Sequence, residues 1–436
     1  MPVSKAVIQN ALPAVAAMLM VLIYNLADTF FIGQTHDAYQ VAAVSLATPV
    51  FLIFMAVGTI FGIGGTSVIS RAFGEGRKDY AGKVCAFCMW SCIIIGVAVS
   101  AGFLLFMDPI LKLIGASEDT WEFTETYLTI VSFSGTFALI SGCFSNILRA
   151  EGQAAKAMKG QLIGNLLNIC LDALFIMVLH WEITGCALAT LFGELAGAAY
   201  YLYYYLTGKS SLSVNICDFT FRDKVPGSVF AIGVPAALGS LLMSVSQIVM
   251  NSRMSSYGDL AVAGVGVAMK IVMITGMISM GIGQGVQPLL GYCTGAGVWD
   301  RFRQYMKFAF TFATVLGVSL TILCYIFTDQ IVSIFLTDEG ASDFAVDFAR
   351  ILLSTGPVFG IFYVITNALQ AMGAAVPSLI INISRQGLVY IPMLFILDAA
   401  LGVTGLVWAQ PAADVISLLI GIVMYSRVLN RSARSN

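Results

Sequence analysis

The stretch QLIGNLLNICLDALFI, Gln161 to Ile176, carries three polar side chains in an otherwise apolar segment. Asn165, Asn168 and Asp172 follow one another at spacings of three and four residues, and such positions share one face of an α-helix. A charged Asp near the centre of a membrane helix costs about 2.5–3.5 kcal/mol. If the segment crosses a membrane, Asp172 therefore indicates a functional site.

The composition of the whole chain is that of an integral membrane protein. Of its 436 residues, 58% are hydrophobic and 11% are charged, whereas about 25% of residues are charged in a soluble protein. Twelve apolar runs can cross a hydrocarbon layer of about 30 Å, which takes about 20 helical residues, and they lack the alternation of a transmembrane barrel. We therefore predict an all-α integral membrane protein with twelve transmembrane helices. The approximate limits are 11–33, 42–70, 84–106, 122–147, 158–180, 183–206, 228–250, 260–291, 304–327, 346–370, 378–398 and 403–426.

Basic residues fall mainly in alternate connections between these runs. Those connections hold 17 of the 22 Lys and Arg residues, and the opposite connections hold only Lys112 and Arg253. Lys and Arg are enriched on the cytoplasmic side of membrane proteins. Both termini are therefore predicted to be cytoplasmic.

The two halves of the chain repeat each other. A single shift along the sequence aligns VAAVSLA at Val41 with VAGVGVA at Val262, and LRAEG at Leu148 with LQAMG at Leu369. Six helices return the chain to the side where it began, so the two copies share one orientation and are related by a pseudo-two-fold axis along the membrane normal. We predict an N-terminal lobe of residues 1–207, a cytoplasmic linker of residues 208–226 and a C-terminal lobe of residues 227–436.

The repeat fails where carboxyl groups enter the helices. Asp28 and Asp172 of the first half correspond to about Val249 and Pro392 of the second half. Because a helix rises about 1.5 Å per residue, one outer layer of the first lobe receives oxygen-bearing groups from four helices. The predicted substrate or proton site consists of Asp28, Asp172, Asn168, Tyr127, Thr190, Asn165 and Asn25.

Two buried carboxyls in one small volume are not expected to ionise together without a cation, because desolvation and mutual repulsion both oppose it. They should hold a proton, a Na⁺ or an organic cation. The oxygen ligands of a Na⁺ would be Asp28, Asn168, Asp172 and Thr190, which suit a hard cation, and we expect no cluster of soft-metal ligands. The alternative role of Asp28 and Asp172 is hydrogen bonding between helices.

Four further charged residues at membrane depth have two interpretations each. Glu194 and the equivalent Asp414 are secondary proton sites or duplicated structural acids. Arg385 forms a structural ion pair or contacts substrate, and Lys270 pairs with an acid or extends its stem along apolar surface. The sequence shows no nucleophile–base pair or metal motif at this depth, which argues against an enzyme.

These residues also carry a family resemblance. Over essentially its full length, the chain resembles the multidrug and toxic compound extrusion (MATE) family. The motifs are NLADTFFIG at Asn25–Gly33, LRAEG at Leu148–Gly152, NLLNICLDALFI at Asn165–Ile176, GQGVQP at Gly283–Pro288 and SRQGLVYIP at Ser384–Pro392, together with Pro13. The branch similar to DNA-damage-inducible protein F has a cation site in its first lobe. Its positions match Asp28, Asn168, Asp172 and Thr190, and a family Tyr matches Tyr127.

The resemblance implies a secondary active multidrug exporter in the cytoplasmic (inner) membrane of a bacterium. Such an antiporter expels lipophilic, often cationic compounds in exchange for Na⁺ or H⁺ by alternating access. We expect a monomer in the lipid bilayer, with amphipathic cations as its small-molecule partners. Beyond the coupling ion, we expect no cofactor, no nucleic-acid partner and no enzymatic activity. The alternative is a flippase or exporter of lipid-linked oligosaccharide from the same superfamily, which should have a more basic cavity.

Overall fold

The computed structural model describes residues 1–35, 37–208, 210–336 and 339–434; Lys209, one of the basic residues counted above, lies outside them. Every regular element in the described residues is a helix. Eleven helices are long and apolar enough to cross a membrane. A twelfth span results if α12 (Glu339–Leu353) and α13 (Gly356–Ala371), which are bent by 47° at their junction, are taken as one. The predicted all-α membrane fold is therefore confirmed.

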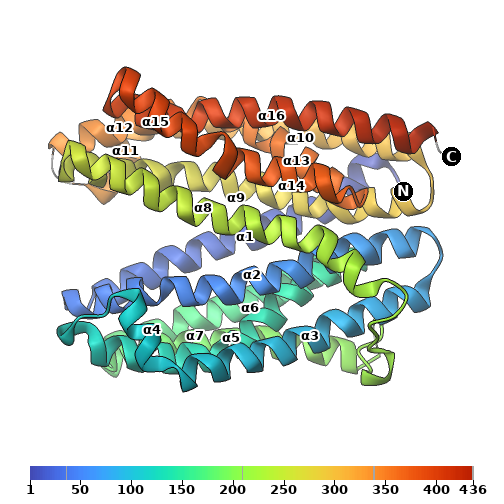
Figure 1. Ribbon diagram of the computed structural model, residues 1–436, viewed down its shortest axis with the longest axis horizontal. Coiled ribbons are helices and arrows are strands. Elements are labelled where there is room, and N and C mark those ends of the chain that lie inside the picture. Colours follow the sequence, from blue (N-terminus) through green and yellow to red (C-terminus); the bar gives the residue numbers. More distant parts are fainter. Residues whose placement is uncertain (36, 209, 337–338, 435–436) are drawn as a thin grey trace. The chain divides into compact units, whose positions relative to one another are not determined.

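The described chain packs as two compact units, shown in Figure 1. The N-terminal unit comprises Leu19–Gly233, and the C-terminal unit comprises Met1–Met18 and the chain from Val234 onward. Two helices, α1 (Val3–Gly33) and α8 (Val225–Met254), contribute residues to both units, and each has an internal proline near the change. Packing units and sequence repeats thus begin at different residues, and the lobe limits given above stay a prediction.

The N-terminal unit is built around α5, which packs against α2, α3 and α7, while α6 packs against α7. Its core contains large buried aromatic side chains such as Phe54, Phe61, Phe87 and Phe144. Besides α1 and the start of α8, its elements are α2 (Ala38–Gly74), α3 (Lys78–Leu105), α4 (Met107–Ile114), α5 (Glu118–Ala150), α6 (Ala154–Asp172), η1 (Ala173–Val178), α7 (Glu182–Leu206) and η2 (Ile216–Asp218).

The C-terminal unit is built around α9 and α13, which pack against each other and against α10. Both chain termini lie at the same end of this unit (Figure 1). Its remaining elements are η3 (Ser255–Tyr257), α9 (Asp259–Gly295), α10 (Trp299–Ile326), α11 (Thr328–Phe335), α14 (Ala375–Ile383), η4 (Ser384–Leu388), α15 (Tyr390–Leu401) and α16 (Val403–Arg434).

The two units repeat the same helix contact between a glycine and an asparagine. A Cβ added to Gly62 would lie 2.9 Å from Asn146 Nδ2, and one added to Gly283 would lie 2.5 Å from Asn367 Nδ2. The second pair occupies the positions that the repeat in the sequence aligns with the first pair. Small residues allow helices to approach closely in lipid, where the hydrophobic effect does not drive helices together. The repeat seen in the sequence thus corresponds to equivalent packing in the two units.

The chain loses α-helical geometry once in the fifth predicted span and once in the eleventh, at positions that the sequence repeat does not align. Residues 173–178 after α6 and residues 384–388 after α14 form π-helical turns, η1 and η4. Such turns are rare and occur frequently at functional sites. Asp172 immediately precedes the first turn, and Arg385 lies within the second.

The connection between the two halves is docked on the N-terminal unit. The Glu151 side chain accepts hydrogen bonds from the Ser210 hydroxyl and the Ser211 amide, at 2.8 and 2.6 Å. Trp90 Nε1 donates to the Val214 carbonyl, and Lys83 Nζ lies 3.0 Å from an Asp223 carboxylate oxygen. The predicted linker is therefore held by polar contacts in addition to its covalent ends.

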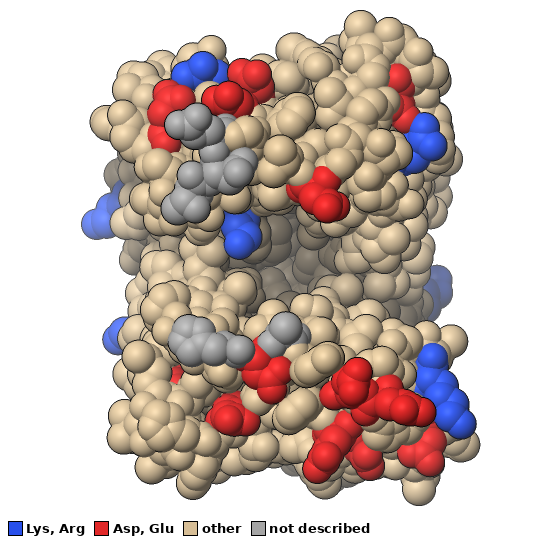
Figure 2. Space-filling view, turned by 90° about the vertical axis from the view of Figure 1, so that its left-hand side faces the viewer, with Lys and Arg blue, Asp and Glu red and all other residues tan. Residues whose placement is uncertain are grey.

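Figure 2 shows the end of the N-terminal unit that carries α4 and the end of the C-terminal unit that carries α11, and acidic side chains predominate at each of these ends. The chain segments at the α4 end include Asp108, Glu118 and Asp119, with Lys112 as the neighbouring basic residue. This distribution agrees with the charge asymmetry in the sequence. It leaves the assignment of the opposite end to the cytoplasm as a prediction.

Candidate functional site

Two of the predicted acids meet a thiol inside the N-terminal unit. Asp28 of α1, Asp172 at the end of α6 and Cys186 of α7 each contribute one atom to a group within 4.8 Å of one another. The Cys186 thiol donates to Asp28 Oδ1 at 3.4 Å. Asp172 and Cys186 are both 0% exposed, whereas Asp28 is half-buried. Helix α1, which is distant in sequence, thus joins the neighbouring helices α6 and α7 in one largely buried polar group.

Helix periodicity places further polar groups beside these three. Asn168 lies one turn before Asp172 on α6, and Thr190 lies one turn after Cys186 on α7. Asn168 Nδ2 donates to Thr190 Oγ1 at 3.5 Å, and the Thr190 hydroxyl donates to the Cys186 carbonyl at 3.2 Å. The predicted pair Asn168 and Thr190 thus links α6 to α7 next to the acids.

The close approach of α6 and α7 depends on glycines. A Cβ added to Gly193 would lie 2.8 Å from Asn168 Cβ, and one added to Gly164 would lie 2.9 Å from the Gly193 carbonyl oxygen. Contacts this short require atoms to shift, and overpacking a tight interior is destabilising. Glycine at both positions therefore lets Asn168 reach Thr190.

Gly193→Ala is expected to destabilise the folded chain by about 1–3 kcal/mol, because the added methyl group must push α6 away from α7. Thermal unfolding of the purified protein in detergent measures the change. Gly142→Ala is the matched control in a neighbouring helix, since a Cβ there meets no atom within 4 Å. Equal unfolding temperatures for the two variants would contradict the tight contact.

Several buried oxygens of the site have no hydrogen-bond partner among the described residues. They are both carboxylate oxygens of Asp172 and the side-chain oxygen of Asn168. Within the same described ranges, no Lys or Arg forms an ion pair with Asp28 or Asp172. Buried polar groups without partners are costly. The arrangement therefore favours a proton or a bound cation at Asp172.

The remaining predicted residues differ in how they relate to this group. Tyr127 of α5 is buried and lies within electrostatic reach of Asp28 and Asp172. Asn165 is half-buried one turn before Asn168, and its Nδ2 has no hydrogen-bond partner in the described part of the chain. The Asn25 side chain is exposed. The structure thus brings Tyr127 to the acids and leaves Asn25 outside the buried group.

Sequence reasoning missed two residues of this site. Tyr24, one turn before Asp28, interacts electrostatically with both acids, and Cys186 places its thiol against Asp28. Their spacings of four residues from Asp28 and Thr190 were the available signals. The cysteines in apolar runs were interpreted as packing residues, but α7 brings one thiol, that of Cys186, to the two acids.

In the C-terminal unit, by contrast, a buried acid forms an ion pair with an arginine of the same chain. Asp414 of α16 accepts from Arg385 Nε and from Gln410 Nε2, both at 2.8 Å, and from the Thr355 hydroxyl at 3.3 Å. The Arg385 guanidinium also lies 4.8 Å from the Phe359 ring centroid. Of the two interpretations of Arg385, the structure supports the ion pair.

The contacts of the two other charged residues at membrane depth, Glu194 and Lys270, do not decide between their interpretations. Glu194, the counterpart of Asp414, forms a hydrogen bond with the Ser141 side chain, and in the described part of the chain it has no ion pair with Lys or Arg. The ammonium group of Lys270 lies 5.4 Å from the Phe335 ring centroid, at the end of an exposed side chain. A cation–π contact of this kind stabilises by about 0.5–1 kcal/mol at an exposed site. Neither geometry requires a role in transport.

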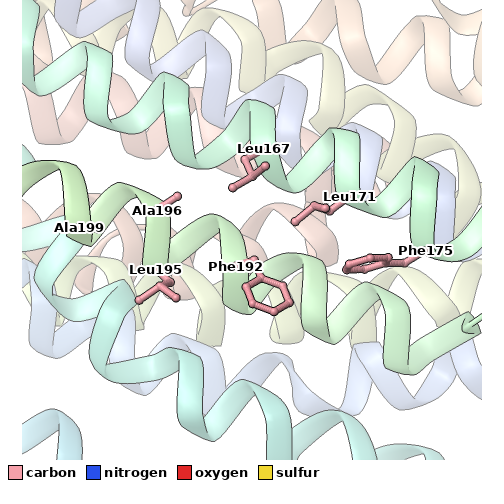
Figure 3. Close-up of a pocket in the computed structure, with 7 residues that line it drawn as sticks. All are labelled: Leu167, Leu171, Phe175, Phe192, Leu195, Ala196 and Ala199. Carbon is pink, nitrogen blue, oxygen red and sulfur yellow. The ribbon is translucent and has the colours of Figure 1, made fainter.

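An apolar groove lies on the N-terminal unit between α6, η1 and α7, as Figure 3 shows. Its volume is about 440 Å³. Its lining consists of Leu167, Leu171, Phe175, Phe192, Leu195, Ala196 and Ala199. None of these side chains belongs to the acidic group, and such a surface within spanning helices suits contact with lipid tails.

Comparisons with known proteins agree with this architecture. The family model described as MatE matches residues 13–174 and 235–396. Multidrug export protein MepA of Staphylococcus aureus (strain MRSA252) is 31% identical over 425 residues, which are 97% of this chain and 93% of that protein. Its counterpart in Staphylococcus haemolyticus (strain JCSC1435) is 30% identical over 430 residues, 98% of this chain and 94% of that one.

Solved structures share the fold. A crystal structure of MATE in complex with MaL6 superposes with a TM-score of 0.95 at 22% identity, and covers 100% of this chain and 98% of that chain. The family model matches the chain twice, once in each half, as the internal repeat requires. The chain therefore belongs to the MatE family, the multidrug and toxic compound extrusion transporters that its sequence motifs resemble.

Proposed function

We propose that this chain exports lipophilic, often cationic compounds in exchange for Na⁺ or H⁺. Its relatives that are named multidrug export proteins support the substrate class. The observation that supports the coupling site is Asp172, which is fully buried beside Asp28 with two carboxylate oxygens that lack partners among the described residues. An acid in this setting binds a proton or another cation and releases it when the protein changes conformation.

The donor set of the site fits either coupling ion. Carboxylate, amide and hydroxyl oxygens of Asp28, Asp172, Asn168 and Thr190 suit Na⁺, and a proton on Asp172 would equally remove the buried charge. We assign these residues, with Tyr127 beside them, to coupling. The placement of the acids in the N-terminal unit, with none on α8, supports the branch similar to DNA-damage-inducible protein F.

Transport then consists of an exchange between two occupants of the exporter. Entry of the coupling cation to the acids favours release of the drug, and binding of a new drug molecule requires release of that cation. We propose alternating access by the two lobes, with both termini cytoplasmic, in the cytoplasmic membrane of a bacterium. The chain is proposed to work as a monomer. A flippase for lipid-linked oligosaccharide is disfavoured, because the buried site is acidic and would repel phosphate.

Efflux of an ethidium-type dye tests the proposal. Cells or proteoliposomes that contain the full chain are given a Na⁺ gradient or a proton gradient separately. Dye efflux should accelerate under at least one inward gradient and should collapse when that gradient is dissipated. Efflux that ignores both gradients would contradict ion-coupled export. Movement of a lipid-linked oligosaccharide without dye transport would favour the flippase.

A further inference from the structure

The coupling site contains a ligand of different chemistry from its oxygens. Cys186 Sγ lies 3.4 Å from Asp28 Oδ1, and its distances to a carboxylate oxygen of each acid stay within 4.8 Å. The thiol is fully buried, as is Asp172, whose two oxygens have no partner within the described ranges. An unpartnered buried carboxylate and an adjacent thiol together form an incomplete coordination shell.

The atoms stand close to the spacing that a thiophilic metal ion requires. Zinc binds thiolate sulfur at about 2.3 Å and carboxylate oxygen at about 2.0–2.2 Å. Tetrahedral ligands at those lengths lie about 3.3–3.8 Å apart. The three ligand atoms now lie within 4.8 Å of one another, so small side-chain rotations would bring them to the spacing that a metal ion requires. Thr190 and the unpartnered Asn168 oxygen are one turn away on α7 and α6 and can supply further oxygen ligands.

The sulfur changes which cations the site prefers. Na⁺ selects oxygen ligands, whereas thiolates select soft and borderline ions such as Zn²⁺ and Cd²⁺. Metal binding requires the thiolate, so the Cys186 proton is released to solvent as the metal–sulfur bond forms. The two carboxylates and the thiolate would then be the ligands of a dication. In the described chain, no Lys or Arg forms an ion pair with either acid and so competes with the metal for it.

We propose that Asp28, Asp172 and Cys186 form a site for a thiophilic divalent cation, with the Cys186 sulfur as a ligand. The site is that of the proposed function. Metal binding, however, requires no export, so a direct binding measurement separates failure of this inference from failure of the proposed function.

Cd²⁺ is the probe. Equilibrium binding of radioactive Cd²⁺ to the purified full chain in detergent gives the affinity and the stoichiometry. The ultraviolet difference spectrum shows whether a thiolate-to-metal charge-transfer band appears. Wild type should bind Cd²⁺ with this band. Cys186→Ala should lose the band. Its affinity for Cd²⁺ should fall by at least roughly 10- to 100-fold, which is the cost of losing even an outer-sphere partner of a metal ligand. Asp172→Asn should weaken binding while keeping the band.

A second group of thiols in the same unit provides the control. Cys88 and Cys143 hydrogen-bond to each other in the core between α3 and α5, and Cys143 also contacts Cys92. Cys143→Ala should leave the affinity and the band of Cd²⁺ unchanged. Loss of Cd²⁺ binding in Cys143→Ala but not in Cys186→Ala would overturn the inference, because the core thiols would then be the site.

Two other results would also overturn it. One is the absence of Cd²⁺ binding to wild type, and the other is binding that neither Cys186→Ala nor Asp172→Asn alters. Cys186→Ser is the control for a folding defect in Cys186→Ala, since serine is similar to cysteine in size and polarity. It should bind Cd²⁺ without the charge-transfer band. If Cd²⁺ binds through Cys186 but wild type shows no ion-driven efflux, the metal site stands and the proposed function fails.

Discussion

Asp172→Asn should abolish ion-driven efflux while the chain remains folded. Asparagine has nearly the size of aspartate and keeps hydrogen-bonding atoms in place, but it carries no negative charge. The wild-type carboxylate is fully buried and lacks a hydrogen-bond partner among the described residues, so its removal should cost little stability. What is lost is the difference in cation affinity between conformations, which typically amounts to about 1–3 kcal/mol, or about 5- to 150-fold, in a coupled system.

The measurement is the initial rate of dye efflux under the gradient that drives wild type. Asp172→Asn should fall at least about tenfold, which is within the range of such a coupling free energy, while its thermal unfolding stays close to that of wild type. Asp108→Asn is the matched control, since Asp108 lies exposed at the start of α4, and it should transport normally. Undiminished gradient-dependent efflux in Asp172→Asn would remove this residue from the coupling site.

Asp28→Asn distinguishes the roles of the two acids in coupling. The half-buried Asp28 carboxylate already accepts from the Cys186 thiol, so neutralising it leaves Asp172 as the remaining anion of the group. If a single proton drives transport through Asp172, Asp28→Asn should retain part of the efflux; if Na⁺ requires both acids, efflux should be lost as in Asp172→Asn. The comparison therefore bears on the identity of the coupling ion.

Most of the helical plan could be predicted from the sequence because spanning helices in lipid need long apolar runs and satisfied backbone groups. The bend in the tenth run was missed. Its signal was Pro357, because proline is favoured in the first turn of a helix and therefore indicates that a new helix begins after Thr355. The π-helical turn after Asp172 could not be predicted, because its residues ALFIMV have the composition of any continuing apolar helix.

The candidate site was predictable in part, for one physical reason. Charged side chains are costly in a membrane, so an acid present in one half of the repeat and absent from the other identifies Asp28 and Asp172. Cys186 carries no comparable penalty, and its chemistry emerges only when α7 is packed against α1. Asn25 was included because it precedes Asp28 by three residues, but its side chain is exposed.

Arg385→Met should destabilise the C-terminal unit by about 3–5 kcal/mol, the cost of removing one partner of a buried ion pair. Asp414 is 1% exposed and accepts from Arg385 Nε at 2.8 Å. Without the guanidinium its charge would be held by the neutral donors Gln410 and Thr355 alone. Methionine roughly retains the length of the arginine stem and its contact with Phe359. The unfolding transition of the purified variant in detergent should therefore shift strongly to lower temperature.

A double variant distinguishes an unpaired charge from a simple packing defect. Replacing both partners of a buried pair is often nearly neutral, so Arg385→Met combined with Asp414→Asn should recover most of the stability that Arg385→Met loses. Arg350→Met is the surface control, because Arg350 and Asp329 form an exposed pair at 3.1 Å, and such pairs contribute about 0–1 kcal/mol. If the double variant is no more stable than Arg385→Met, the loss comes from packing around Phe359 and not from Asp414. In the N-terminal unit, where no such arginine is paired with Asp172 in the described chain, the same reasoning favours a proton or a bound cation at Asp172.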